Sequence, residues 1–437
     1  MQEQAQADAV QAARPANSPA RILFASLIGT AIEYFDFYIF GTAAVLVFPK
    51  LFFPSSDATM ATLQSLATFG LAFIARPVGS ALFGHFGDRI GRKATLVASL
   101  LTMGLSTVLI GLLPSYASVG ILAPVLLAIL RFGQGLGLGG EWGGAVLLAT
   151  ENAPPGKRAW YGMFPQLGGP AGFALSGAAF LYLTTHLPEA DFLDWGWRIP
   201  FIASALLVVV GLYVRLNITE TPEFEKVLKK HERVKVPMVA VITQHPRALV
   251  LGTLAGTGEF VLFYLTTVFT LSWATSSLGY ARADFLVLQL ISAIFFAGFI
   301  PVSAKLSDAR GRASAMIIGS VGIIIFGLVL GPMLQAGSLT TVLALSIGMA
   351  LMGTCFGSFG TLMSDLFPAE VRYTGSSLAF NLAGILGASF APYIATWLAT
   401  NFGLQFVGYY LSGMALMSLV ALLMIRSLLA RRAHGTN

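Results

Sequence analysis

Runs of about 20 apolar residues follow one another almost from end to end of this chain, separated by short breaks of Gly, Pro or charge. A bilayer core about 30 Å thick needs a run of that length for each spanning helix. We count about twelve runs, from Ile22–Phe48 to Gln405–Ile425. Only 11% of the residues are charged, against about 25% in soluble domains. The pattern predicts an all-α membrane protein with no room for a soluble catalytic domain, so we do not expect an enzyme.

The distribution of charge predicts how the chain lies in the membrane. Its 26 Lys and Arg outnumber its 20 acids, but the cations stand in short loops between spans, which favours membrane topology over nucleic-acid binding. An N-terminus in the cytoplasm puts most of these loops inside, as the positive-inside rule requires. Residues 1–20 lack a cleavable signal and are interpreted as a disordered tail. We therefore expect a multi-pass protein of a cell inner membrane with both termini cytoplasmic.

Three sets of residues recur in the same order in the second half of the chain. Asp88, Gly91 and Arg92, in the basic hairpin Gly84–Lys93, recur 220 positions later as Asp308, Gly311 and Arg312. Two further pairs of segments match at offsets of 214 and 226. They are Glu151 to Arg158 with Asp365 to Arg372, and Glu33 to Tyr38 with Glu259 to Tyr264.

Ordered echoes of this kind indicate a parallel duplication. They predict two six-helix bundles, residues 21–216 and 248–425, joined by a cytoplasmic linker at 217–247 and followed by a short tail at 426–437. Within the linker, Thr221–Lys230 has the pattern of a helix lying on anionic lipid, and a solvated linker is an equal alternative.

Acidic residues inside the spans are candidates for proton coupling. Glu33 and Asp36 are three residues apart and so share a helix face, and Glu259 repeats the first of them in the second half. An ionised acid at mid-bilayer costs at least about 2.5 kcal/mol, so its presence is a functional hypothesis by default. The alternative is a charge pair with a membrane arginine that only fixes packing.

Arginine and neutral polar residues inside the spans are candidates for substrate binding. Arg76 and Arg131 lie near the middle of their spans, where a guanidinium can hold a carboxylate by two parallel hydrogen bonds. Alternatively they neutralise the membrane acids. Neutral hydrogen bonds are expected from Gln134, Gln166, Tyr38 and Asn381, each of which can instead join helices.

Two further patterns are interpreted as structural. Gly135, Gly139 and Gly143 form a ridge without side chains, which favours close helix packing over a phosphate loop. Trp195, Trp197 and Arg198 are expected to anchor the chain at the outer interface. The histidines lack metal-ligand clustering, so neither a metal nor another cofactor is expected.

The duplicated polar loops predict a gate at the cytoplasmic face. Asp88 with Arg92, and Glu151 with Arg158, are expected to form charge pairs there. These pairs and helix-end contacts would hold the two halves together when the carrier is open outward, whereas the alternative is that the cations only set topology. The gate residues are Gly84, Asp88, Arg89, Gly91, Arg92, Glu151, Arg158, Asp308, Arg312, Asp365 and Arg372.

The hairpin and its copy resemble the signature loop of the major facilitator superfamily. The segments Arg131 to Gly144, Trp195 to Phe201, Glu220 to Phe224 and Phe367 to Gly375 are similar to the metabolite:proton symporter family within it. The second-half copy departs from the pattern, with Ala304 in place of Gly and no Arg directly after Asp308.

The resemblance implies two bundles that alternate around a central cavity, with proton entry driving uptake of a small organic anion, such as shikimate or a di- or tricarboxylate. A proton-coupled carrier of proline or betaine and a transporter-like nutrient receptor are the alternatives. The expected partners are the organic acid, the proton and the bilayer, and the chain is expected to be a monomer.

Overall fold

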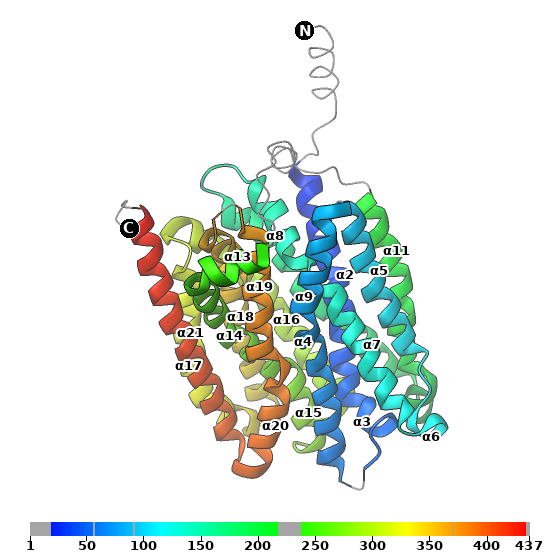
Figure 1. Cartoon of the computed structure of the whole chain (residues 1–437). Helices are drawn as coiled ribbons and strands as arrows, with labels where there is room; N and C mark the ends of the chain where they lie inside the picture. Colours follow the sequence, from blue (N-terminus) through cyan, green and yellow to red (C-terminus); the bar gives the residue numbers. More distant parts are fainter. Residues whose placement is uncertain (1–18, 56, 91, 217–236, 369, 434–437) are drawn as a thin grey trace.

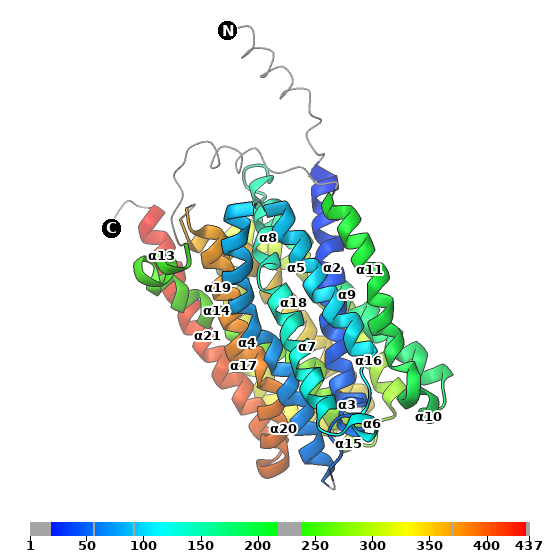
Figure 2. The same ribbon diagram turned by 45° about the vertical axis from the view of Figure 1, so that its right-hand side comes forward.

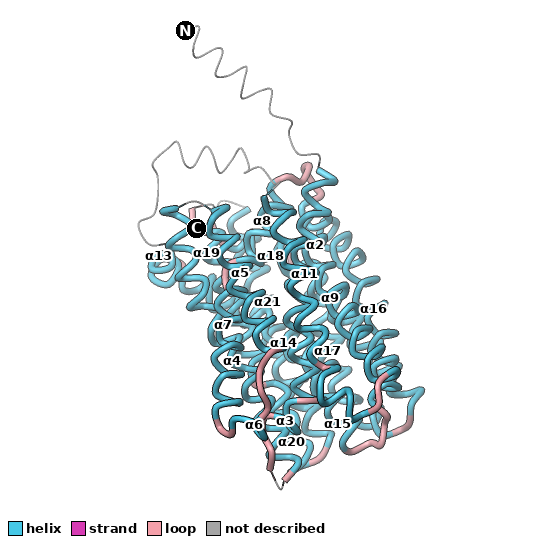
Figure 3. Tube along the Cα trace, turned by 90° about the vertical axis from the view of Figure 1, so that its right-hand side faces the viewer, coloured by secondary structure: helices cyan, strands magenta, loops and turns pink. Residues whose placement is uncertain are grey.

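In the part of the chain that it describes, the computed structural model consists of helices joined by short loops, with no strand (Figure 3). It describes residues 19–55, 57–90, 92–216, 237–368 and 370–433, and only the backbone of residues 19, 21–22, 84–90, 92–96, 214–216 and 432–433. Within these ranges, 11 helices are long and apolar enough to cross a membrane, and the shorter apolar helix Val97–Gly111 fills the place of the remaining expected span. The predicted all-α membrane fold is confirmed.

The first half of the chain contains α2 (Pro19–Leu46), α3 (Phe48–Leu51), α4 (Ala58–Ile90), α5 (Arg92–Gly111), α6 (Tyr116–Val119), α7 (Leu122–Leu138), α8 (Glu141–Glu151), α9 (Arg158–His186), α10 (Glu189–Asp191), η1 (Phe192–Gly196) and α11 (Arg198–Leu216). The second half contains α13 (Pro237–Gln244), α14 (Pro246–Tyr264), η2 (Leu265–Phe269), α15 (Thr270–Ser276), α16 (Arg282–Arg310), α17 (Ser314–Gln335), α18 (Ser338–Leu366), α19 (Arg372–Gly384), η3 (Ile385–Ser389), α20 (Ala391–Phe402) and α21 (Leu404–Ala433).

The long helices lie side by side, and α2 begins at the same end of the bundle at which α21 ends (Figure 1). We call this end the terminal face and the other end the opposite face. Helix α9 of the first half packs against α16 and α18 of the second, and α4 packs against α19, η3 and α20. These contacts form the interface on which any site shared by the two halves must be built.

The predicted hairpin at Gly84–Lys93 is almost entirely helical. Helix α4 continues to Ile90 and α5 begins at Arg92, so only Gly91, which lies outside the described residues, separates them. Its copy is similar, because α16 runs to Arg310 and the chain turns at Gly311, whose φ of 99° favours glycine. The turn is shorter than the expected loop, because Gly84 and Gly87 do not end α4 and the second copy stays helical up to Arg310.

Gly135 and Gly139 of the glycine ridge lie where α7 crosses α4, and Gly143 lies in α8 against α19. A Cβ atom on Gly135 would stand 2.6 Å from Ala72 Cα and 2.8 Å from its carbonyl carbon, and Gly139 approaches the backbone of Arg76 and Ser80 in the same way. Only residues without a side chain allow two helix backbones to come this close. The packing interpretation of the ridge is confirmed.

Gly135→Val is expected to separate α4 from α7, because the clash is with backbone that cannot rotate away. Overpacking of this kind costs about 1–3 kcal/mol or more, so the melting temperature in detergent should fall by several degrees. The control is Gly413→Val in α21, where an added Cβ would meet no atom within 4 Å. Equal losses in both variants would mean that helix propensity, not packing, is responsible.

The expected interfacial anchor is divided between two environments. Trp195 is half exposed, whereas Trp197 is fully buried and its ring packs edge-on against Phe48 and Phe52. Arg198 stacks on Trp197 and donates from Nη1 to the carbonyls of Gly111, at 2.9 Å, and Leu113, at 2.6 Å. Trp197 and Arg198 therefore join helix ends within the protein, which corrects the prediction for these two residues.

Candidate functional site

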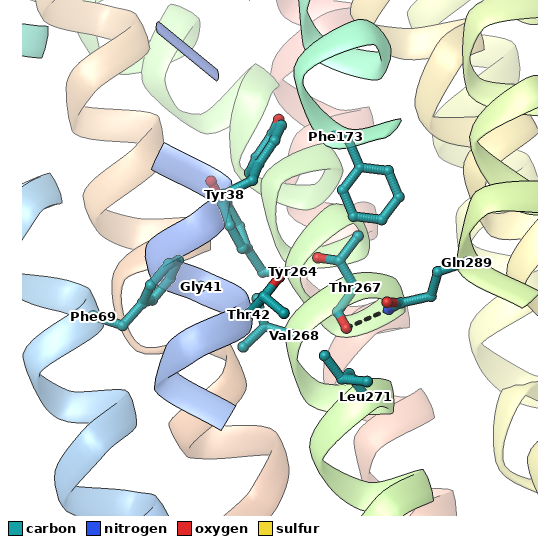
Figure 4. A pocket seen from close by; sticks show the side chains of 10 residues that line it. All are labelled: Tyr38, Gly41, Thr42, Phe69, Phe173, Tyr264, Thr267, Val268, Leu271 and Gln289. Carbon is teal, nitrogen blue, oxygen red and sulfur yellow. Dashed lines mark hydrogen bonds between the residues drawn. The ribbon is translucent and has the colours of Figure 1, made fainter. Parts of the chain in front are cut away.

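A small cavity lies between the two halves of the chain (Figure 4). Its volume of about 20 Å³ has room for about one water molecule, so no larger molecule fits in it in this conformation. The lining residues are aromatic, hydroxyl-bearing, aliphatic or amide, and none is charged. They are Tyr38, Gly41, Thr42, Phe69, Phe173, Tyr264, Thr267, Val268, Leu271 and Gln289.

One wall of the cavity is a π-helical turn. In η2 the backbone widens over Leu265–Phe269, and Gln289 Nε2 donates to the Thr267 carbonyl at 2.7 Å across the cavity wall, as Figure 4 shows. Single π-turns within α-helices occur often at functional sites because they break the regular hydrogen-bond ladder. This turn supplies Thr267 and Val268 to the cavity.

The predicted proton-coupling acids are all buried within the spans. Asp36 is 1% exposed and Glu259 is 2% exposed, and neither carboxyl has a hydrogen-bond partner among the described residues. The Asp36 carboxyl lies beside the hydroxyls of Thr107 and Ser204. Glu33 is also buried. Because a buried carboxylate without a cation costs several kcal/mol, the surroundings of Asp36 and Glu259 suit proton-bound carboxyls.

Arg76 and Arg131 are held by aromatic rings. The Phe37 ring lies between them, with its centroid 4.6 Å from Arg76 Cζ and 4.3 Å from Arg131 Cζ. Arg131 also lies 4.0 Å from the Phe40 centroid, and cation–π contacts of this length stabilise a desolvated guanidinium by about 2 kcal/mol. Arg131 is fully buried, and its Nη2 has no hydrogen-bond partner in the described part of the chain.

The three predicted neutral amides all join helices. Gln134 accepts from Arg131 Nη1 at 3.0 Å and donates to Thr107 at 2.8 Å, within the first half. Gln166 accepts from Trp142 Nε1 at 3.0 Å and donates to the Phe356 carbonyl of the second half at 2.8 Å. Asn381 donates to Ser80 Oγ and the Gly139 carbonyl across the same interface. Among the predicted substrate-binding residues, only Tyr38 lines the cavity in this conformation.

Charged residues join the two halves at the terminal face. The Asp308 carboxylate accepts from the backbone amides of Ala159 and Trp160, both at 3.0 Å, at the start of α9. Arg312 Nη1 donates to Asp308 at 2.6 Å, and Arg312 Nε donates to Asp365 at 2.9 Å. Arg158 of the first half also pairs with Asp365, at 3.2 Å. An acid at a helix N-terminus is stabilised by the unpaired amides and the helix dipole.

The remaining gate residues are described less completely. Gly84, Asp88, Arg89 and Arg92 lie in the helix ends where only the backbone is described, and Gly91 lies outside the described residues. Arg372 donates to the Phe367 carbonyl at 3.4 Å, and Glu151 is exposed. Arg158 was expected to pair with Glu151 of its own motif, but its ion pair is with Asp365, the copy of Glu151 in the other half.

A weaker ion pair joins the halves at the opposite face. Glu189 Oε1 accepts from Lys50 Nζ at 2.7 Å and from Arg282 Nη2 of the second half at 2.9 Å. The Glu189 side chain is 61% exposed, whereas those of Asp308 and Asp365 are 13% and 19% exposed. Exposed pairs contribute about 0–1 kcal/mol, so the terminal face is held more firmly than the opposite face.

Comparison with known proteins decides the family. The profile of the Major Facilitator Superfamily matches residues 26–387. The chain belongs to this superfamily. Members of the superfamily are transporters, so the chain is a multi-pass transport protein and not an enzyme. The resemblance noted in the duplicated hairpins is thereby confirmed.

Within the superfamily, similar proteins transport metabolites. The chain is 57% identical to the inner membrane metabolite transport protein YhjE of Escherichia coli (strain K12), over 94% of each chain. It is 35% identical to the shikimate transporter of the same organism, over 92% of this chain and 94% of that protein. The crystal structure of a D-xylose-proton symporter matches with a TM-score of 0.72 and 19% identity, over 93% of this chain and 96% of that one, which shows the shared fold.

Several cavity residues of this superfamily member were not predicted. Thr42, Phe173, Thr267 and Gln289 stand in apolar runs without a recurring motif, so nothing in the sequence distinguished them from packing residues. Trp142 was also missed, although its ring stacks on Phe380 of the other half with centroids 3.8 Å apart. These residues come together only where the two halves of the chain pack against each other.

Proposed function

We propose that this transporter is a proton symporter that takes up a small organic anion by alternating access. The observation that carries the proposal is a cavity lined by both halves, together with two buried carboxyls on helices that line it, Asp36 on α2 and Glu259 on α14, that have no cation partner among the described residues. Such groups can bind a proton in one conformation and release it in another. Forming and breaking the contacts of the duplicated gate residues would interconvert those conformations.

Buried positive charge supports an anionic substrate. Arg131 Cζ lies 5.0 Å from the ring centroid of the cavity residue Phe69. Arg76 Cζ lies 4.8 Å from that of Phe73, whose ring packs on the cavity residue Tyr264. Neither arginine lines the cavity in this conformation. Movement of Phe37 would bring their guanidiniums within reach of a substrate carboxylate. Tyr38, Gln134, Gln166 and Asn381 are proposed to give neutral hydrogen bonds as the halves separate.

The proposed arrangement in the cell follows the charge distribution. Both termini are placed in the cytoplasm of a cell with an inner membrane, which makes the terminal face the cytoplasmic gate. The two bundles, 21–216 and 248–425, are joined by the linker at 217–247 and rock against each other, and one chain is the working unit. In these terms the structure has its cytoplasmic gate closed.

An osmolyte carrier is the second candidate, and a specific observation favours it. The cavity walls are aromatic and uncharged, with Tyr38, Phe69, Phe173 and Tyr264 around the space. Aromatic cages bind quaternary ammonium groups through cation–π attraction. Betaine is therefore a chemically reasonable competitor.

An uptake panel in proteoliposomes tests these functions. Radiolabelled shikimate, 2-oxoglutarate, citrate, proline and betaine are offered with and without an imposed pH gradient. We expect one organic acid to accumulate severalfold above equilibrium only when the outside is more acidic. Accumulation of betaine alone would favour the osmolyte carrier, and binding without flux would indicate a receptor.

A further inference from the structure

The short helix α13 presents an apolar surface that nothing in the described protein covers. Ala240 and Val241 are buried against the bundle, whereas Val239 and Ile242 are 54% and 50% exposed. Positions three apart lie on one face of a helix, so these two side chains form a continuous apolar patch. In water such a patch on a short helix would be unfavourable by about 25 cal/mol for each Å² left exposed.

The position of α13 explains the patch. Only His245 separates it from α14, which enters the bundle, and α13 lies across the end of α14 rather than along its axis (Figures 1 and 2). In all three views it lies beside the C-terminal end of α21, at the terminal face (Figures 1, 2 and 3). A helix in this place lies along the membrane surface where a spanning helix begins.

Two guanidiniums lie at the same level as this patch. Helices α14 and α21 are antiparallel neighbours, and Ser418 Oγ donates to the Leu254 carbonyl at 2.6 Å. Arg247 precedes Leu254 by seven residues, toward the start of α14. Arg426 follows Ser418 by eight residues, toward the end of α21. At 1.5 Å per residue, both lie about 10–12 Å from the contact, in the same direction. Both are exposed and neither pairs with a carboxylate in the described part of the chain.

We propose that α13 lies in the membrane interface, with Val239 and Ile242 among acyl chains and Arg247 and Arg426 on the headgroups of anionic phospholipid. An apolar face beside a basic rim is the arrangement by which interfacial helices bind anionic membranes. The sequence indicated such a helix at Thr221–Lys230, which lies outside the described residues, whereas α13 follows it. The partner is the lipid leaflet at the terminal face.

Depth measurements test the apolar part of the proposal. In a Cys355→Ser background, nitroxide labels are placed at Val239→Cys, Ile242→Cys and, as a control, the exposed polar site Gln244→Cys, in vesicles of phosphatidylcholine and phosphatidylglycerol. Relaxation by oxygen should exceed relaxation by a water-soluble nickel chelate at 239 and 242, and the order should reverse at 244. Equal access of the nickel reagent to all three sites would show that α13 faces water and overturn the proposal.

Lipid selectivity tests the basic part. Spin-labelled phosphatidylglycerol should associate with the wild-type chain more than spin-labelled phosphatidylcholine. One cation near an anionic membrane surface contributes about 1 kcal/mol, which is about fivefold in the binding constant. Arg247→Gln and Arg426→Gln should therefore each reduce the preference for phosphatidylglycerol severalfold. The control, Arg310→Gln, removes an exposed cation of the terminal face at the end of α16. An unchanged preference in both variants would remove the headgroup role, and neither measurement depends on transport.

Discussion

Replacing Asp36 with Asn is expected to abolish proton-driven accumulation while substrate exchange continues. The Asn side chain has nearly the shape of a protonated Asp, so the buried site next to Thr107 and Ser204 should remain packed. It cannot release a proton, so the pH gradient can no longer drive uptake. At one proton per substrate a gradient of two pH units supports about 100-fold accumulation, because each unit is equivalent to about 1.4 kcal/mol. The variant should lose nearly all of it.

The measurement compares gradient-driven uptake with counterflow in proteoliposomes. The matched control is Asp191→Asn, the same change at an exposed site of the opposite face. Glu33→Gln and Glu259→Gln, examined in the same way, show whether one acid or several carry the coupling. If Asp36→Asn and Glu33→Gln both accumulate substrate normally, proton coupling through these acids is wrong.

The sequence was sufficient to predict features that depend on one helix at a time. The membrane spans follow from run length, because lipid requires an apolar surface whatever the neighbouring helix is. The ridge at Gly135 and Gly139 could also be predicted, since a position without a side chain lets any neighbouring helix approach closely. Recurrence of Asp308 and Arg312 identified charged residues of the terminal face.

The sequence was insufficient for features that depend on which helices meet. Gln166 and Asn381 have the composition of cavity residues, yet each joins the halves through backbone carbonyls. Thr267 and Gln289 line the cavity because a π-turn and a neighbouring helix place them there. Trp197, expected at the interface, is buried because its indole, between η1 and α11, packs against Phe48 and Phe52. No local pattern contains this information.

The terminal-face contacts also show that a copy that departs from the motif can still join the two halves. The second-half copy departs more from the superfamily pattern, since Ala309 follows Asp308 where the first copy has Arg89. Yet Asp308 accepts three hydrogen bonds, two of them from the first half. The missing arginine is not needed, because the amides at the start of α9 and the Arg312 guanidinium already surround the carboxylate.

Asp308→Asn is therefore expected to open the terminal face. The variant keeps a side chain of the same size but loses the negative charge that the α9 amides and Arg312 stabilise. Hydrogen bonds to charged groups contribute about 1.5–3 kcal/mol, and partial exposure reduces this to about 1–2 kcal/mol. The ratio of open to closed molecules should then rise about 5- to 30-fold.

Distances between spin labels measure this shift. In a Cys355→Ser background, labels at Lys157→Cys and Ala309→Cys report the separation of the halves, since both sites are exposed at the terminal face. The longer distances should gain population in Asp308→Asn, and Asp365→Asn should act in the same direction because Asp365 pairs with Arg158. The control is Glu370→Gln, an exposed acid of the same face.

Glu189→Gln at the opposite face should change the populations little, because its pairs with Lys50 and Arg282 are largely solvent-exposed. Stronger ion pairs at the terminal face than at the opposite face would make the closed terminal gate the resting state. The opposite face would then open more easily. An unchanged distance distribution in both Asp308→Asn and Asp365→Asn would show that these contacts do not hold the gate. The closed terminal face would then depend on apolar packing, such as that of Trp142 on Phe380.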